Sequence, residues 1–146
     1  MWNEIHTEDD INNLMNSYGH FHDSCIKEIR YVSGAFVGAD MCMNPMNTLR
    51  TVDVIFQRQN RNYTTIVIRF LRLDTLHLSP QKENYSCEIH NAMIFFKDNL
   101  VYWLDGLTTE SEIEDYSGTW LCAEKLQWRV IDECFENDNV FRAIFD

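Results

Sequence analysis

Two histidines and an aspartate lie close together near the start of the chain, as His20, His22 and Asp23. On an extended segment, side chains two residues apart point the same way, so both imidazoles would face one side. A His-x-His pair is a workable first half of a metal site, and Asp23 could orient one ring. The structural alternative is that Asp23 accepts backbone N–H bonds at a helix–strand junction. We take all three as candidates for binding a ligand or a partner. We predict no metal site, because a third ligand would have to come from far along the chain.

Glu124 is the fourth candidate residue. It lies in a strand-like segment, 119–131, whose even positions read Trp120, Cys122, Glu124, Leu126, Trp128 and Val130. A carboxylate on the inward face of a strand is costly unless it is paired, and an inward carboxylate is a candidate general acid or base. The alternative is that the strand twists, so that Glu124 reaches solvent or pairs with an arginine of the middle strands.

Acidic residues are concentrated in the second half of the chain. The formal net charge is −11, of which residues 1–73 contribute −1 and residues 74–146 contribute −10. The densest run contains Glu110, Glu112, Glu114 and Asp115, and it lacks the residue order of a calcium-binding loop. Such a surface repels phosphates and attracts basic proteins, so we expect a basic protein partner and no nucleic acid.

Five arginines form the opposite feature in the middle of the chain: Arg50, Arg58, Arg61, Arg69 and Arg72 fall within 23 residues that contain one acid, Asp53. Arginine is suited to bind carboxylates or phosphates. One interpretation is a solvated sheet face that pairs with the acidic half of the same chain. The same complementarity would serve a homodimer interface.

The sequence contains no motif of a known enzyme class. It has no Gly-rich phosphate loop, no G-x-S-x-G elbow and no dinucleotide fingerprint. We therefore assign no catalytic residue and no cofactor. The five cysteines form no C-x-x-C pair, which favours buried, reduced thiols. The methionines, Met41, Met43 and Met46 among them, read as packing residues.

The pattern of apolar residues predicts one helix followed by strands. Thr7 and Asp10 resemble a capping box, and Ile11, Leu14, Met15 and Tyr18 recur at helical spacing, which predicts a helix over 7–18. Alternating patterns predict strands over 25–32, 36–43, 51–57, 64–71, 85–95, 100–105 and 119–131. For the tail, 132–146, a short helix and an edge strand both remain open.

Strands joined by short turns imply antiparallel pairing. We predict an α+β fold, mostly antiparallel β, with one N-terminal helix; the sheet would be a strongly bent sheet, a sandwich or a partly open barrel. The length of 146 residues fits a single domain, 1–146. No basic, apolar leader and no apolar run of about 20 residues is present, so we expect a cytoplasmic protein without a membrane span.

The segment Phe21-His22-Asp23-Ser24-Cys25-Ile26, which opens the β region after a short acidic helix, resembles a known motif. It is similar to the Phe/Leu-His-Asp-Ser/Ala-x-Ile/Val start of several small uncharacterised bacterial families, some of which are described as immunity proteins of polymorphic toxin systems. The resemblance covers about 10 residues, excludes His20 and brings no catalytic residues with it. It implies a cytoplasmic bacterial protein that binds rather than catalyses.

The leading hypothesis is therefore a non-enzymatic cytoplasmic interaction protein, of the toxin-neutralising, immunity-like kind. The alternative is a β domain, or an enzyme, that binds a small molecule or a metal with the His20/His22/Asp23 region. A third hypothesis is a homodimer in which basic strands meet acidic loops.

Overall fold

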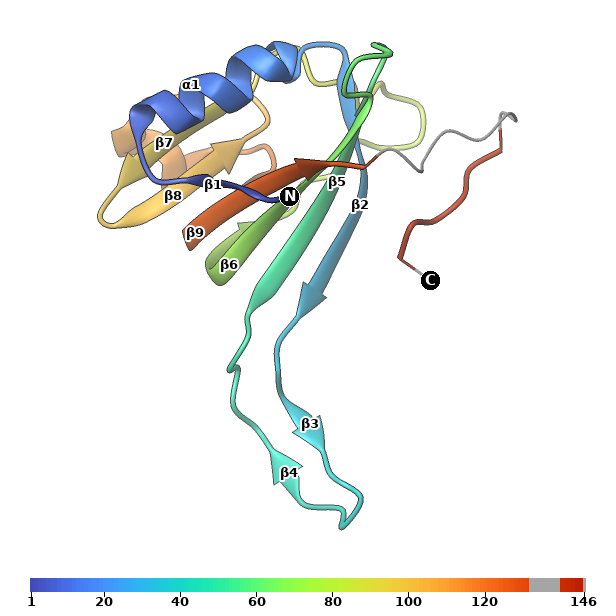
Figure 1. Ribbon diagram of the computed structural model, residues 1–146, viewed down its shortest axis with the longest axis vertical. Helices are drawn as coiled ribbons and strands as arrows, with labels where there is room; N and C mark the ends of the chain where they lie inside the picture. The colour runs from blue at the N-terminus through green and yellow to red at the C-terminus, as the bar shows by residue number, and fades with distance from the viewer. Residues whose placement is uncertain (132–139, 146) are drawn as a thin grey trace.

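The computed structural model describes residues 1–131 and 140–145 (Figure 1). Its helical elements are one α-helix and two short 3₁₀ helices: α1 (Glu8–Ser17), η1 (Gly19–Phe21) and η2 (Glu110–Asp115). Its strands are β1 (Asn3–Ile5), β2 (Ser24–Val32), β3 (Phe36–Val37), β4 (Met43–Asn44), β5 (Thr51–Arg58), β6 (Thr65–His77), β7 (Met93–Lys97), β8 (Leu100–Leu104) and β9 (Trp120–Val130).

Seven strands form one antiparallel sheet in the order β2-β5-β6-β9-β8-β7, with β1 also paired to β9. The two long strands, β6 and β9, pair along their length. The first half of β6 also pairs with β5, and the first residues of β9 also pair with β8. Within the described residues the sheet does not close into a barrel. The predicted α+β fold, mostly antiparallel β with one N-terminal helix, is confirmed.

Helix α1 covers one face of the sheet (Figure 1). The predicted capping box is present: the side chain of Thr7 accepts the N–H of Asp10, and the carboxylate of Asp10 accepts the N–H of Thr7. Ile11, Leu14 and Met15 on the inner side of the helix are buried. They pack into a core formed by the inward residues of the sheet: Val52, Val54, Phe56, Ile66, Ile68, Phe70, Trp103, Leu121, Leu126 and Trp128.

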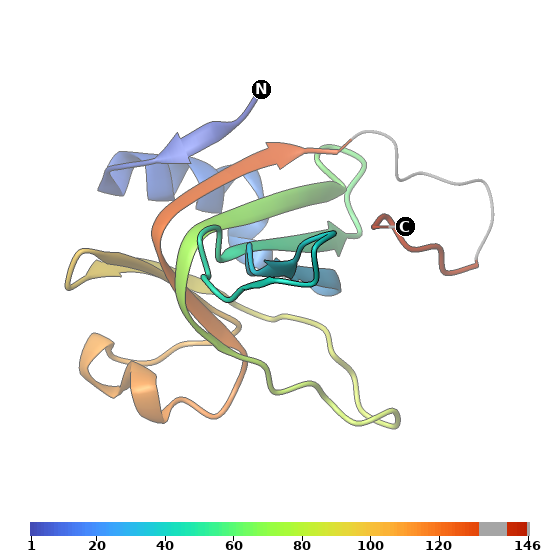
Figure 2. The ribbon, with the colours of Figure 1, turned by 90° about the horizontal axis from the view of Figure 1, so that it is seen from below.

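The sheet bends where β6 and β9 change the face that they present, and Figure 2 shows both strands curving through this region. The β6–β9 register shifts between Leu73 and Thr75, and Arg72 has a positive φ of 55°. Opposite them, Glu124 and Lys125 are both exposed, which breaks the inward–outward alternation of β9. As a result, Trp120 and Cys122 point into a second, smaller core around Ile113, while Leu126 and Trp128 point into the main core.

Several details of the sequence prediction are wrong. The even positions of β9 do not share one face, because of this change of face. Residues 85–92 form no strand: Ile89 makes only an isolated bridge to Ser24, and β7 begins at Met93. The predicted strand over 36–43 is a short hairpin outside the main sheet. Residues 132–139 and 146 lie outside the described residues, and the described tail, 140–145, is neither helix nor strand.

Candidate functional site

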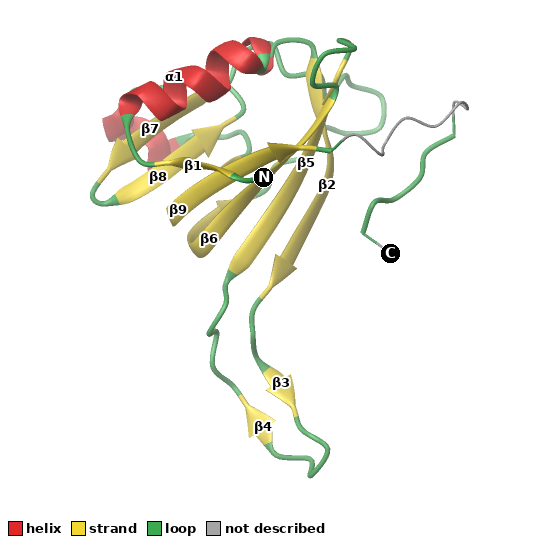
Figure 3. Cartoon of the chain, in the orientation of Figure 1, coloured by secondary structure: helices red, strands yellow, loops and turns green. Residues whose placement is uncertain are grey.

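The hairpin between β2 and β5 projects far from the body of the protein (Figure 3). We call residues 33–49 the arm. Its two strands, β3 and β4, pair only with each other, through Phe36↔Asn44 and Val37↔Met43. At the tip, Cys42 donates its N–H to the carboxylate of Asp40 at 3.0 Å, and this bond lowers the pKa of Asp40. The arm therefore has a defined turn, but it packs against no core.

The arm carries many apolar side chains, and most of its residues are exposed. Asp40 is its single charged residue. Six large apolar side chains are between 51% and 81% exposed: Phe36, Val37, Met41, Met43, Met46 and Leu49. Side chains of consecutive strand residues point to opposite faces, so Phe36 lies on one face, and Val37 and its partner Met43 lie on the other. Both faces of the arm are thus apolar, which is unusual for an isolated hairpin in water.

The neck of the arm is held by tight backbone contacts. Leu49 and Arg50 both donate their N–H groups to the carbonyl of Ser33, at 3.0 and 3.2 Å. Gly34 has a φ of +94°, and a Cβ at this position would lie 2.5 Å from the Oγ1 of Thr48 and 2.8 Å from the N of Leu49. Only glycine fits this conformation and this space, so Gly34 fixes the angle at which the arm leaves the sheet.

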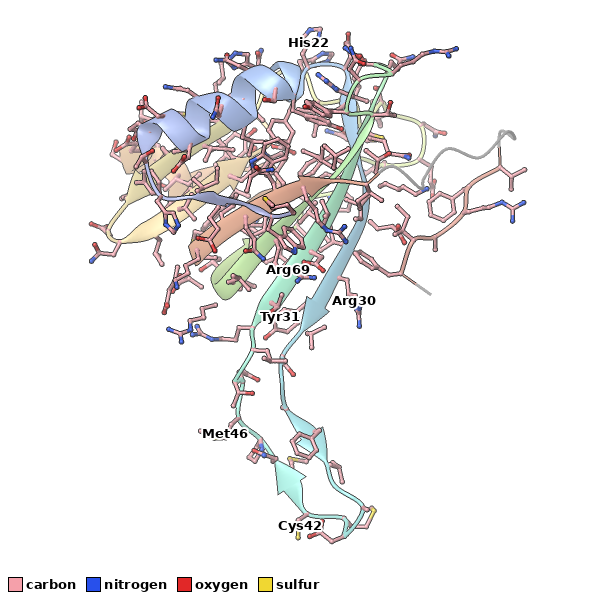
Figure 4. The ribbon with its side chains drawn as sticks, in the orientation of Figure 1. His22, Arg30, Tyr31, Cys42, Met46 and Arg69 are labelled. Atoms are coloured by element: carbon pink, nitrogen blue, oxygen red, sulfur yellow. The ribbon has the colours of Figure 1, made fainter. Side chains whose placement is uncertain are left out.

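Charged residues lie on or beside β2, β5, β6 and β9 toward the end of the sheet that carries the arm, and we call Arg30, Arg50, Arg72, Glu124 and Lys125 the collar. Glu124 accepts a hydrogen bond from Arg72 at 3.2 Å and lies 3.9 Å from Arg50. Arg50 also donates to the carbonyl of Leu73 at 3.1 Å, which ties the arm to β6. Arg30 lies where the arm meets the body (Figure 4). The collar has four cations and one carboxylate, and a further exposed carboxylate, Asp74, directly follows Leu73, so this region has a small excess of positive charge although the whole chain is acidic.

The outcome for Glu124 follows from this geometry. Its side chain is 44% exposed and does not enter the core, so of the two alternatives for Glu124 the one observed is the solvent-facing carboxylate paired with arginines. The physical reason is the change of face in β9, which turns this position to solvent. Glu124 is thereby placed to position the base of the arm.

The His20/His22/Asp23 region forms a tight turn between α1 and β2. Four of its residues have a positive φ: Gly19, His20, Phe21 and Asp23. All three candidate side chains are exposed. The Nδ1 of His22 lies 3.1 Å from the carboxylate of Asp23, and its ring centroid lies 6.5 Å from that of His90. The turn thus brings His22 and Asp23 together at the surface, beside His90.

The buried residues of this turn are Phe21 and Ser24. The ring of Phe21 is fully buried and contacts Tyr18, Phe56 and Trp103 edge to face, with centroids 5.0 to 5.8 Å away. The hydroxyl of Ser24 donates to the carbonyl of Phe21 at 2.6 Å. The backbone of Asp23 and Ser24 pairs with Ile89 on both sides. These contacts make the motif a structural anchor for the start of β2.

The structure does not bring Glu124 to this turn. His22 lies just before the first residue of β2. Glu124 pairs with Arg50, and the next residue, Thr51, pairs with Val32, the last residue of β2. The eight residue steps of β2 at about 3.3 Å each put its ends roughly 26 Å apart. Figure 4 shows His22 at the end of the body opposite the arm. Glu124 and the histidines therefore do not share one site.

The predicted acidic surface lies on η2. Glu110, Glu112, Glu114 and Asp115 are exposed, and Ile113 between them is buried in the second core. Among the described residues none of these four carboxylates has an ion pair. The single inward isoleucine thus holds a short helix that presents its acids to solvent, away from the arm.

A groove of about 790 Å³ lies between the loops 78–91 and 105–119. Its apolar lining includes two exposed leucines, Leu78 and Leu107. The lining also contains Ile26, Ser79, Pro80, Gln81, Ser86, Cys87, Glu88, Ile89, His90, Asn91, Asp105, Gly106, Tyr116, Ser117, Gly118 and Thr119. Among these described residues are two carboxylates, Glu88 and Asp105, and no lysine or arginine. His20, His22 and Asp23 do not line it.

Sequence reasoning missed the arm and the groove. The signal for the arm was present: 17 residues, 33–49, with one charge and three methionines. It was read as packing, but Met41, Met43 and Met46 are 81%, 69% and 61% exposed. The prediction of buried thiols is likewise wrong for Cys42 and Cys87, which are exposed; Cys134 lies outside the described residues.

The arginine cluster is divided among several structural roles. Arg69 makes a bidentate ion pair with the buried Asp53, at 2.7 and 2.8 Å. Arg58 donates to three backbone carbonyls, including that of Ser17 at the end of α1. Arg50 and Arg72 pair with Glu124. These arginines thus mostly stabilise the fold. The expected pairing with the acidic second half of the chain is limited, among these contacts, to Glu124.

Two tyrosines give this region a measurable pH dependence. Burial raises the pKa of Tyr102 to about 12, and burial with a hydrogen bond to Asp105 raises the pKa of the groove residue Tyr116 to about 12. The unfolded chain, with an ordinary tyrosine pKa of about 10, loses these protons first. The free energy of unfolding should therefore fall between about pH 10 and pH 12, by on the order of 1.4 kcal/mol per pH unit for the buried Tyr102.

Urea unfolding at a series of alkaline pH values checks this expectation. Tyr102→Phe should flatten the slope, because it removes one of the titrating groups. An identical slope in wild type and variant would contradict the assignment.

Comparison with models of protein families, with curated proteins and with solved structures finds no match. In the part of the chain that the structure describes, no group of three or more His, Cys, Asp or Glu side chains is arranged to hold a metal ion. No helix among the described residues has the length and apolar character needed to span a membrane.

Proposed function

We propose that this protein is a non-enzymatic interaction protein that acts in the bacterial cytoplasm, of the toxin-neutralising, immunity-like kind. The observation that carries the proposal is the arm, with six large apolar side chains left in water. Large apolar side chains gathered on one exposed segment mark a protein–protein contact in soluble proteins. Methionine, which supplies half of these side chains, adapts its shape to a partner at low cost.

A basic partner is supported by a second surface. The four acids of η2 are exposed, and they have no ion pair among the described residues. A preformed acidic surface speeds the association of a basic protein and makes it sensitive to salt. The similarity of Phe21-His22-Asp23-Ser24 to immunity proteins favours a toxin as this partner.

The geometry gives less support to the alternative, a ligand or metal site at His20, His22 and Asp23. These side chains lie at the surface of a turn, and the groove is lined by other residues. Glu124, on β9, lies near the end of β2 that is farther from these three residues. A site for chemistry needs its groups within hydrogen-bond reach of one reacting atom.

The test is capture of a partner from an extract of the organism that encodes the protein. Wild type should retain a protein at low salt, and the double variant Phe36→Ser/Met43→Ser should lose it. Glu110→Gln/Glu112→Gln/Glu114→Gln should weaken capture mainly at low salt. Tyr63→Ser removes an exposed aromatic ring far from the arm and serves as the matched control. Retention of no protein at either salt concentration overturns the proposal.

A growth assay tests the toxin-neutralising part. Co-expression with a toxic neighbouring gene should restore growth with wild type, and not with the variant that fails in capture. Capture of a partner without any rescue from toxicity leaves the binding function standing and removes the immunity role.

A further inference from the structure

We propose that the arm of one copy docks into the groove of a second copy of the chain. The inference goes beyond the proposed function, because it names a second copy as the occupant of the arm in the absence of another protein partner. It rests on three features of the described residues: the two apolar faces of the arm, the composition of the groove, and the charges around each.

The arm requires an occupant that encloses it. Phe36 on one face and Val37 with Met43 on the other are each at least 51% exposed. A flat surface would cover only one of these faces and leave the other in water. A groove covers both faces of a narrow two-stranded hairpin, as it does for other extended segments that bind by insertion.

The groove supplies a surface of the required kind. Leu78 and Leu107 line it and are 53% and 67% exposed, so the groove also leaves apolar side chains uncovered. Ile89 and Tyr116 add apolar surface deeper in the lining. Contact between the arm and the groove would remove both sets of side chains from water at once.

The charges favour this pairing over contact between two arms. The groove has the carboxylates Glu88 and Asp105 and no lysine or arginine in its lining. The collar at the base of the arm is basic, so it is attracted to the carboxylates of the groove of another copy and repelled by the collar of another copy. Asp40, the single acid of the arm, already accepts the N–H of Cys42 at 3.0 Å.

The arm and the collar supply enough residues for one side of a standard interface. The arm and the collar together comprise 22 residues. A standard interface uses about 20 to 30 residues on each partner. If each copy inserts its arm into the other, the two contacts close a two-fold dimer; otherwise they extend into a chain of copies.

Two native cysteines make the docking directly testable. Cys42 lies at the tip of the arm, Cys87 lines the groove, and both are exposed. A short bismaleimide, which adds one thiol to each end, should join Cys42 of one copy to Cys87 of another. Peptide mass spectrometry identifies the linked pair. Cys42→Ser and Cys87→Ser should each abolish the product. A Cys42–Cys42 product, or no product, would overturn the proposal.

Solution mass gives an independent measurement. Wild type and the control Tyr63→Ser should sediment at twice the mass of one chain or more. Phe36→Ser/Met43→Ser should sediment as single chains. Leu107→Glu leaves the arm intact and should weaken association at least about 10-fold, as loss of a central interface residue does. Single-chain mass for wild type at all concentrations overturns self-docking.

The two proposals fail in different ways. Wild type that is monomeric but still captures a partner through the arm removes self-docking and keeps the interaction function. Wild type that is dimeric with the Cys42–Cys87 link, and that captures no further protein, keeps self-docking and removes the toxin-neutralising role.

Discussion

Replacing Phe21 by alanine is expected to lower the free energy of unfolding by about 3–5 kcal/mol, the usual effect of emptying a buried aromatic position. The ring is fully buried and meets three other aromatic rings edge to face. Each such pair adds roughly 0.5–1.5 kcal/mol beyond burial. Equilibrium unfolding in urea, followed by tryptophan fluorescence because Trp103 is one of the contacts, measures the loss.

His22→Ala is the matched control, one residue away in the same turn. Its side chain is 58% exposed, so its removal should change the free energy of unfolding by no more than about 0.5 kcal/mol. The pair of variants separates a motif that stabilises the fold from a motif that binds a ligand. A loss below about 1 kcal/mol for Phe21→Ala would contradict the role as an anchor.

Replacing Gly34 by valine is expected to release the arm from its fixed position while the body stays folded. Valine at a φ of +94° is strained, and its Cβ would overlap Thr48 and the backbone of Leu49. The bonds from Leu49 and Arg50 to the Ser33 carbonyl should break, because the two sides of the neck have to separate. Hydrogen exchange should show faster exchange at these amides, with little change in β5, β6 and β9.

Gly38→Ala provides the control within the same arm. A Cβ at this position would lie 3.0 Å from the side-chain oxygen of Asp40, which can move, and 3.8 Å from the carbonyl oxygen of Cys42, an ordinary contact. Exchange at the neck should therefore match wild type. If the amides of Leu49 and Arg50 exchange in Gly34→Val as they do in wild type, the neck contacts do not depend on glycine at position 34.

The local elements of the fold could be predicted because their signals lie in neighbouring residues. The Thr7–Asp10 capping box marks the start of α1, and the alternation of Val52, Val54 and Phe56 marks β5 and its inward face. The turn between β7 and β8 contains Asp98 and Asn99, both with positive φ, which is the conformation that these residue types tolerate. Each of these features depends on a few consecutive residues.

The candidate site was predicted less well, since it depends on residues far apart in the chain. The inward alternative for Glu124 assumed that β9 keeps one face throughout, but the bend opposite Arg72 reverses that face. The partner of Glu124 is 52 residues away. No alternation within β9 contains this information, because the bend comes from its pairing with β6.

By itself, the sequence determined a capped helix, a set of antiparallel strands and an acidic second half, because hydrogen bonding at helix ends and burial of alternate side chains act over a few residues. Only the tertiary structure decided that residues 33–49 leave the sheet, that the basic residues gather at their base, and that Leu78 and Leu107 line one groove. The type of an apolar residue does not indicate whether its side chain is buried or exposed. Its exposure is set by which distant strands the chain brings to it, and for the arm the described chain brings none.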